Sequence, residues 1–484
     1  MSKKYSLKKQ ATYLFSGKFI TFVIRFIIPL ILVRVFNKEE YGTYRQMFLV
    51  GSFLIPILQM GMASSVFFFF PNVKGKESQL FSQTFIFLVL SGLLSFPILY
   101  LFEDSLVWLF KNDTFKDYIF LCASYSFFTM IAKLLEYVLI LEKRTKSLLK
   151  YLVWSEVIRT FLMVMAIILF KTIESVFISQ IVFQAIITLI LFFYINKRYG
   201  LFNIRLWNRS ILKNQIKYSF PLGFGEMART IGKRANGFIL NAFLTASDYA
   251  IYTVGSFRIP LIKEFYSSIA RVTRPKIAEF WRQGKHKEAK DLWHKQIVKF
   301  YTATFPIVVF FFIMAHPIIT FLYTMEYEAS VNIFRILIII LFLQASSWGT
   351  IPKAYNATKF IFWSNTISMI VGVPLAFILI RYYGLYGAAI AAVFTFFIDV
   401  IMQIIKSKTL LGLSLKTWLP WKDLINISAI CLGLSLPILY LHTLEMNKIA
   451  LILLGGLIFF IPLGLVYNKV GIMNLKELYK SIRH

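Results

Sequence analysis

The sequence has few of the residues on which several large classes of protein depend. Only two of its 484 residues are cysteines, Cys122 and Cys431, and both fall inside hydrophobic segments, so we expect neither a disulfide framework nor a zinc site. The five histidines are scattered, and we find no Walker motif and no Ser/His/Asp constellation. These absences argue against an enzyme and predict no cofactor and no metal.

Hydrophobic side chains, by contrast, are in excess. They make up 58% of the residues and include 51 Phe, which no water-soluble core of this size requires. About 20 apolar residues cross a hydrocarbon core of about 30 Å, and in lipid a continuous apolar run forms a helix because a helix satisfies its own backbone hydrogen bonds. Fourteen stretches qualify, at residues 12–35, 44–70, 80–102, 118–141, 151–170, 175–195, 218–243, 249–271, 298–322, 330–351, 360–380, 384–405, 424–441 and 449–467. We therefore predict an all-α polytopic membrane protein with about 14 transmembrane helices.

The distribution of charge indicates how these spans are oriented. The formal net charge is +30, which in a soluble chain would suggest nucleic acid as a partner. The basic residues alternate by loop, however: 35 fall on one side, beginning with the N-terminal MSKKYSLKKQ, and 7 on the other. By the positive-inside rule both termini lie in the cytoplasm, and the even number of spans agrees. We expect no nucleic-acid partner, and we expect the first span to be retained because it is too long for a signal peptide.

One segment of the chain occurs twice. GSFLIPILQMG begins at residue 51 and GSFRIPLIKEF at residue 255, and EYGTY and DYAIY match upstream of the two copies. The repeat pairs spans one and two with spans seven and eight. Six-helix halves of the same orientation are a transporter architecture, in which the substrate is handled between the halves. In the second copy Leu54 is replaced by Arg258, which predicts that this helix faces a cavity.

The repeat predicts a division into two lobes. Residues 1–199 form an N-terminal lobe with spans one to six, and residues 200–217 form a cytoplasmic linker. Residues 218–408 form a C-terminal lobe with spans seven to twelve, and residues 409–484 hold two further spans and a cytoplasmic tail. The largest outward loop runs from about residue 103 to 117, which leaves no room for an external catalytic domain.

Eleven basic and five acidic residues fall within the predicted spans when Arg45, Arg271 and Lys299, at the span ends, are counted with the loops. Each costs about 2.5 to 3.5 kcal/mol at the centre of a bilayer even on the lenient scale, so such side chains normally face a bundle interior or water. Guanidinium and ammonium groups in such a space suit phosphate oxygens. We predict a cationic cavity whose substrate-binding residues are Arg25, Arg258, Arg229, Lys233 and Lys18.

Structural roles compete with these assignments. Lys18 lies within reach of the membrane interface, where its ammonium group can extend to the headgroups. Glu226 with Arg229, and Glu156 with Arg159, lie three residues apart and can pair along one helix. For Arg25 we favour substrate binding, because its own helix contains no acid.

Two further sets of residues relate to the transport cycle. Asp399 is the only acid in its predicted span and is a candidate for ion or proton coupling, as are Glu226 and Glu136. Pro29 and Pro221 interrupt the first and seventh spans, which the repeat makes partners, and we expect them to act as hinges.

Three stretches resemble a known family. LILVRVFNKEEYGTYRQM (residues 30–47), QMGMASS (59–65) and YYGLYGAAIAAVF (382–394) resemble the Wzx-type flippases, the polysaccharide-biosynthesis branch of the multidrug/oligosaccharidyl-lipid/polysaccharide (MOP) exporter superfamily. The resemblance implies a MATE-like fold, with two six-helix lobes and two C-terminal helices. It also implies an oligosaccharide on polyprenyl pyrophosphate as cargo, and a central cavity lined by Arg residues of the first and eighth helices, where Arg25 and Arg258 fall.

We therefore expect a flippase of the bacterial plasma membrane that moves a polyprenyl-pyrophosphate-linked oligosaccharide outward by alternating access. The product would serve a cell-surface polysaccharide of the O-antigen (lipopolysaccharide), capsule, exopolysaccharide or teichuronic-acid type. Expected partners are the lipid-linked substrate, membrane lipids, and the polymerase and chain-length proteins of the same pathway. The alternatives are a multidrug or organic-cation antiporter of the same superfamily, and a polytopic polysaccharide polymerase.

Overall fold

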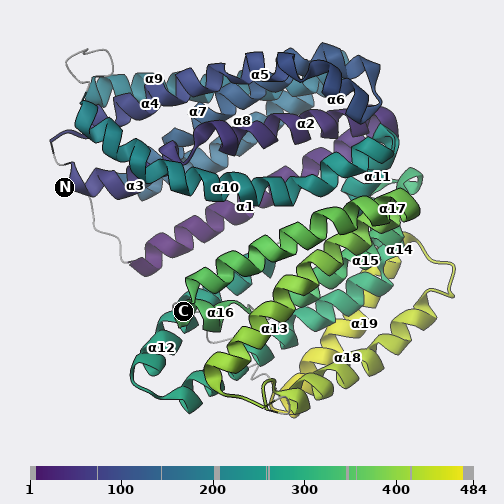
Figure 1. Ribbon diagram of the computed structural model, residues 1–484. Coiled ribbons are helices and arrows are strands. Elements are labelled where there is room, and N and C mark those ends of the chain that lie inside the picture. The colour runs from purple at the N-terminus through teal and green to yellow at the C-terminus, as the bar shows by residue number, and fades with distance from the viewer. Residues whose placement is uncertain are drawn as a thin grey trace. The chain divides into compact units, whose positions relative to one another are not determined.

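The computed structural model describes residues 7–73, 75–142, 144–200, 208–257, 259, 262–344, 348–355, 357–414 and 417–472. Within these ranges all regular secondary structure is helical, which confirms the all-α prediction (Figure 1). The chain divides into two compact units, Met1–Ala250 and Ile251–His484, and each is described by itself.

In the first unit a set of long helices packs side by side with shorter ones at their ends (Figure 1). α1 lies along α8, and α7 packs against α2, α4 and α9. The helices are α1 (Leu7–Val35), α2 (Lys38–Gln59), α3 (Met62–Phe69), α4 (Glu77–Leu93), α5 (Ser95–Leu101), α6 (Glu103–Phe110), α7 (Ile119–Leu141), α8 (Thr145–Phe170), α9 (Ile173–Tyr199) and α10 (Arg209–Phe243), with 3-10 turns at Phe70–Asn72 and Asp113–Tyr118. α11 (Ala246–Gly255) runs across the boundary between the units.

The second unit is centred on α13, which packs against α12, α15 and α18. Its core includes the fully buried side chains of Trp293, Ile297 and Phe459. The helices are α12 (Ile262–Arg282), α13 (His286–Ile313), α14 (Ala315–Tyr323), α15 (Ser330–Gln344), α16 (Thr350–Ala354), α17 (Thr358–Leu411), α18 (Trp421–Leu441) and α19 (Lys448–Lys469), with a 3-10 turn at Met325–Tyr327.

Several predicted spans are single helices, and others are broken. The span at 118–141 is α7, which begins at Ile119 and ends at Leu141. The span at 44–70 is α2 and α3, bent by 42° at a break where Met60 and Gly61 both have positive φ. The spans at 360–380 and 384–405 both lie in α17, which is interrupted by the non-helical backbone of Gly384.

Among the described residues, eight helices are long and apolar enough to cross a membrane, or nine if the bent α2–α3 pair is one span. These helices make the chain a multi-pass membrane protein. α17 counts once in this number although its 54 residues cover two predicted spans. The count is therefore consistent with the predicted 14 spans without fixing that number.

The observed boundary between the units differs from the predicted lobe boundary. α10 belongs to the first unit, where it packs against α2, α3, α4 and α6. The sequence places most of this helix in the C-terminal lobe. Because compactness in one conformation does not define which parts move together, the division into 1–199, 200–217, 218–408 and 409–484 stays a prediction about the transport cycle.

The two copies of the repeated segment have different structures. In the first copy the helix continues from Gly51 through Pro56 to Gln59. In the second copy α11 ends at Gly255, and Ser256 and Phe257 follow outside any helix. The sequence identity of the two segments therefore does not extend to their backbone conformation.

α10 crosses the break between α2 and α3 at two glycines. A Cβ atom on Gly223 would lie 2.5 Å from the backbone carbonyl carbon of Met60, and one on Gly61 would lie 2.8 Å from the backbone oxygen of Ser219. No side chain fits in this space. Glycine at both positions therefore allows the backbone of α10 to approach the break directly.

Gly223→Ala is expected to lower the free energy of unfolding by about 1 to 3 kcal/mol, because the added methyl group pushes α10 away from Met60. Gly225→Ala is the matched control: its Cβ position is open, and in a helix Ala is more stable than Gly by about 0.5 to 1 kcal/mol. The thermal unfolding midpoint of the purified protein measures both effects. Equal midpoints for the two variants would contradict the close approach.

Candidate functional site

The first unit holds a carboxylate shared by two guanidinium groups. Glu156 on α8 is almost fully buried, with 3% of its side chain exposed. Its Oε2 accepts a hydrogen bond of 2.6 Å from Nε of Arg25 on α1, and its Oε1 accepts one of 2.9 Å from Nε of Arg159, one turn along α8. The buried carboxylate therefore joins α1 to α8 and neutralises one of the two cations.

A second group of charges lies on α7 and α10. Glu226 and Arg229 form an ion pair across one turn of α10, with Oε1 and Nη2 3.3 Å apart. Lys133 on α7 interacts electrostatically with Glu226 and with Glu136, which lies one turn further along α7. The i,i+3 pair predicted from the sequence is therefore present, and it has a third, basic neighbour from another helix.

The two groups belong to one region of the first unit. Tyr151 of α8 interacts electrostatically with both Glu136 and Arg25, which places the group on α7 and α10 near the pair on α1 and α8. We call the charged residues of this region the charged cluster: Arg25, Lys133, Glu136, Glu156, Arg159, Glu226 and Arg229. It contains four cations and three carboxylates, so one positive charge is in excess.

The cations of the charged cluster differ in what they offer a ligand. The side chain of Arg25 is 63% exposed and that of Arg229 is 61% exposed. Among the described residues, Arg25 uses only its Nε in a hydrogen bond, so neither of its terminal nitrogens is engaged by a described partner. Arg159 is 21% exposed and donates from Nε and Nη2 to Glu156. Arg25 and Arg229 therefore keep donors available to an oxyanion.

The second unit holds the predicted coupling residue Asp399. Its Oδ1 accepts a hydrogen bond from the hydroxyl of Ser364, and its Oδ2 accepts one of 2.6 Å from Nε2 of Gln403. Both carboxylate oxygens are engaged by neutral donors of α17. Within the described parts of the chain, no group of three or more His, Cys, Asp or Glu side chains could hold a metal ion.

A family comparison decides the relationship of the chain to known proteins. A family model described as "Polysaccharide biosynthesis protein" matches residues 31–332, which is more than half of the chain. The chain belongs to the polysaccharide biosynthesis protein family. The resemblance of residues 30–47 and 59–65 to this family is thereby confirmed. No curated protein matches the chain significantly in sequence.

Solved structures show the fold of this polysaccharide biosynthesis protein in two kinds of transporter. The lipid II flippase MurJ, in an inward closed conformation, matches with a TM-score of 0.72 at 18% identity, covering 95% of this chain and 100% of MurJ. A multidrug resistance MATE family transporter of the MOP superfamily, in an outward-facing conformation, matches with a TM-score of 0.56 at 14% identity, over 84% and 96% of the two chains. A MOP superfamily transporter from Pyrococcus furiosus gives 0.56 at 13% identity, over 84% and 96%. The predicted MATE-like fold is therefore correct.

The absence of an acid from its own helix does not leave Arg25 without a carboxylate partner. Arg25 has an acidic partner, but Glu156 comes from a helix 131 residues away rather than from its own helix. No local pattern in the sequence signals this pair, because the order in which membrane helices pack is not encoded in the spacing of one segment. The ion pair between Glu156 and Arg159, by contrast, follows from their i,i+3 spacing.

The structure describes only some of the remaining predicted residues. Arg258 lies outside the described residues, and so do the side chains of Lys18 and Lys233. Pro29 and Pro221 lie inside α1 and α10, which are assigned as continuous helices across both prolines. Their role as hinges stays a prediction.

Glu156→Gln is expected to lower the free energy of unfolding of this polysaccharide biosynthesis protein by about 1 to 3 kcal/mol, because two guanidinium groups lose their shared carboxylate. Arg25→Ala should cost less than about 1 kcal/mol, because Arg25 is largely exposed and Arg159 still pairs with Glu156. Thermal unfolding of the two purified variants tests the order of the effects. A larger loss for Arg25→Ala would show that Glu156 is not the centre of the cluster.

Proposed function

We propose that this protein is a flippase that moves a polyprenyl-pyrophosphate-linked oligosaccharide across the plasma membrane of a bacterium, with no catalytic step of its own. Membership of the polysaccharide biosynthesis family supports the pathway, and the fold shared with MurJ and MATE transporters supports transport. The observation that carries the proposal is the exposed guanidinium of Arg25 within α1, the helix that contains the first predicted span.

The pyrophosphate is the part of the substrate that the charged cluster suits. Guanidinium groups bind phosphate oxygens through short, charge-assisted and bidentate hydrogen bonds. Glu156 holds Arg25 by Nε and leaves the two terminal nitrogens for a ligand oxyanion. We assign the same role to Arg229 from its exposure, and to Arg258, Lys233 and Lys18 from the sequence alone.

A cation exporter of the same superfamily is the less favoured alternative. Such a transporter needs carboxylates that are free to face its substrate. In the charged cluster Glu156 is buried between two guanidinium groups, Glu226 pairs with Arg229, and Glu136 has Lys133 beside it. The exposed charge of this region is therefore mainly positive, which favours an anionic headgroup.

The cellular setting follows from the sequence and from the proposed substrate. Both termini lie in the cytoplasm, because the basic loops fall on their side of the membrane. The substrate's sugars would be polymerised after translocation, so polymerase and chain-length proteins are the expected pathway partners. The glycan belongs to one of the surface polysaccharide classes: O-antigen, capsule, exopolysaccharide or teichuronic acid.

Deletion of the gene is expected to cause a polyprenyl-pyrophosphate oligosaccharide to accumulate on the cytoplasmic side of the membrane, because the carrier can no longer cross. Mass spectrometry of the lipid fraction measures the accumulation. Wild type should reverse it, whereas Arg25→Ala, Arg229→Ala and Arg258→Ala should each reduce the rescue at least about tenfold, the loss expected for one charge-assisted phosphate contact.

Lys150→Ala is the control, because Lys150 is an exposed cation of α8 outside the charged cluster. It should rescue like wild type at equal protein level. If nothing accumulates on deletion, the substrate class is wrong. If all three arginine variants rescue fully, the site assignment is wrong.

Asp399 is the residue that we propose to couple transport to an ion or proton gradient, with Glu226 and Glu136 as weaker candidates because both have basic neighbours. Asp399→Asn keeps the size of the side chain and removes its charge. It should slow gradient-driven transport in proteoliposomes by at least about tenfold and abolish its dependence on the gradient. Asp423→Asn, an exposed acid on α18, is the control. Unchanged gradient dependence in Asp399→Asn would refute this role.

A further inference from the structure

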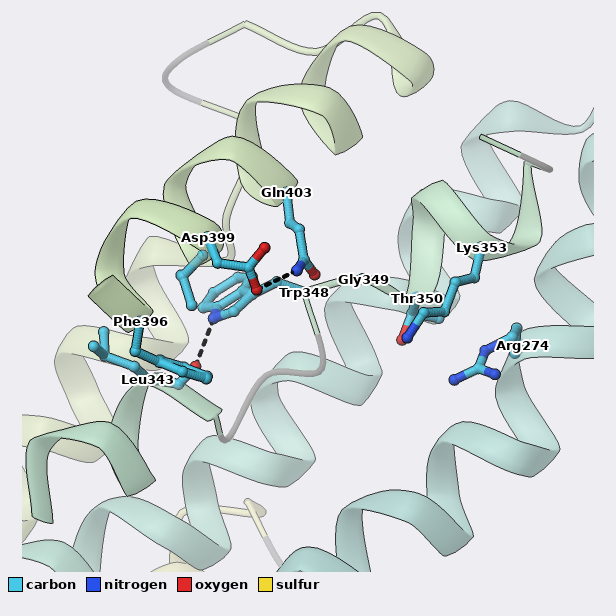
Figure 2. A pocket seen from close by; sticks show the side chains of 10 residues that line it. Arg274, Leu343, Trp348, Gly349, Thr350, Lys353, Phe396, Asp399 and Gln403 are labelled. Atoms are coloured by element: carbon cyan, nitrogen blue, oxygen red, sulfur yellow. Dashed lines mark hydrogen bonds between the residues drawn. The ribbon is translucent and has the colours of Figure 1, made fainter. Parts of the chain in front are cut away.

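A second polar site lies in the second unit and shares no residue with the charged cluster. A cavity of about 160 Å³ opens among α12, α16 and α17, beside the end of α15. It is lined by Arg274, Leu343, Trp348, Gly349, Thr350, Lys353, Phe396, Asp399, Val400 and Gln403. Figure 2 shows Arg274, Thr350 and Lys353 on one side of this space and Asp399 and Gln403 on the other.

Among the described residues, neither cation of this cavity has a hydrogen-bonded or ion-paired partner. Nε of Arg274 is buried and has no hydrogen-bond partner, although nearly all buried donors in proteins have one. Neither Arg274 nor Lys353 forms an ion pair with any described residue, and the two act electrostatically on each other. Desolvation and the Arg274 guanidinium lower the pKa of Lys353 from its ordinary value. The Asp399 carboxylate acts on Lys353 in the opposite sense but more weakly than Arg274, so the repulsion between the two cations is offset only in part.

The Asp399 carboxylate of the cavity does not form an ion pair with either cation. Asp399 accepts a hydrogen bond from Gln403 (Figure 2) and another from Ser364, so each of its oxygens already has a neutral donor. The indole nitrogen of Trp348 is also engaged, donating to the backbone oxygen of Leu343 over 2.8 Å. Only the cationic side of the cavity keeps unused donors.

The shape of the cavity is maintained by a close contact of the backbone. A Cβ atom on Gly349 would lie 2.6 Å from Oε1 of Gln403. The turn before α16 therefore comes directly against the α17 side chain that holds Asp399, and α16 carries Lys353 and Thr350 into the lining. A cavity of this size accommodates a tetrahedral oxyanion but not an oligosaccharide.

We propose that this cavity is a phosphate-binding site, in which Arg274 and Lys353 bind the oxygens of either free inorganic phosphate or the phosphodiester of an anionic lipid headgroup. An oxyanion supplies the acceptor that Nε of Arg274 lacks and offsets the repulsion between the two cations. The proposal does not depend on the flippase function, because its ligand need not be the transported substrate.

Two binding experiments on the purified full-length protein distinguish the sources of the phosphate. In the first, inorganic phosphate is titrated into protein in a phosphate-free detergent, with chloride as the ionic-strength control, and binding is measured by calorimetry. In the second, nanodiscs of phosphatidylglycerol and of phosphatidylcholine are compared, and retained lipid is counted by native mass spectrometry. Saturable binding by wild type is expected in at least one experiment, and the one that is positive names the source.

Arg274→Ala and Lys353→Gln should each weaken this binding at least about tenfold, as expected for loss of a charge-assisted contact. Lys276→Ala is the matched control, since Lys276 is an exposed cation of α12 outside the lining, and it should bind like wild type. Lys353→Gln alters a side chain on the short α16 and leaves α12 intact, so it remains informative if Arg274→Ala does not fold. Absence of saturable binding in both experiments, or binding by folded Lys353→Gln equal to wild type, would overturn the proposal.

Discussion

The cost of placing charge in a hydrocarbon layer governs this structure. Each intramembrane cation needs an acid, water or a polar ligand. The buried carboxylate of Glu156 is the acid for both Arg25 of α1 and Arg159 of α8. Because Oε1 and Oε2 accept from different helices, the carboxylate fixes the register of α1 against α8 as well as the charge. The packing of these two helices and the presentation of Arg25 therefore depend on the same contact.

Most of the fold could be predicted from the sequence because it depends on local properties. Hydropathy alone predicts a span at 118–141 that matches α7 within a residue, and the i,i+3 spacing predicts the pairs at Glu156 and Glu226. The breaks are harder to predict. Gly61 and Gly384 adopt conformations outside the helical region, yet other glycines of the chain, such as Gly225, lie inside unbroken helices.

The candidate site could be predicted only in part, because it is assembled from distant segments. The residue types and their depth in the membrane follow from the sequence, but the partner of Arg25 lies 131 residues away and has no local signature. The same limitation applies to the repeat. GSFLIPILQMG and GSFRIPLIKEF share their first residues, yet the first segment stays helical and the helix before the second ends at Gly255.

The partial neutralisation of the charged cluster bears on how a transporter can both bind and release an anion. Four cations facing a pyrophosphate without any acid would hold it strongly in a low-dielectric space, and tight binding in every state slows release. Three carboxylates reduce the excess to one positive charge, while the exposed side chains of Arg25 and Arg229 keep directional donors. In the flippase that we propose, such a cluster would recognise a phosphate by geometry more than by net charge. A carrier must release its substrate on the other side of the membrane. In the proposed mechanism, the Glu156 carboxylate favours release because it neutralises part of the positive charge of the cluster.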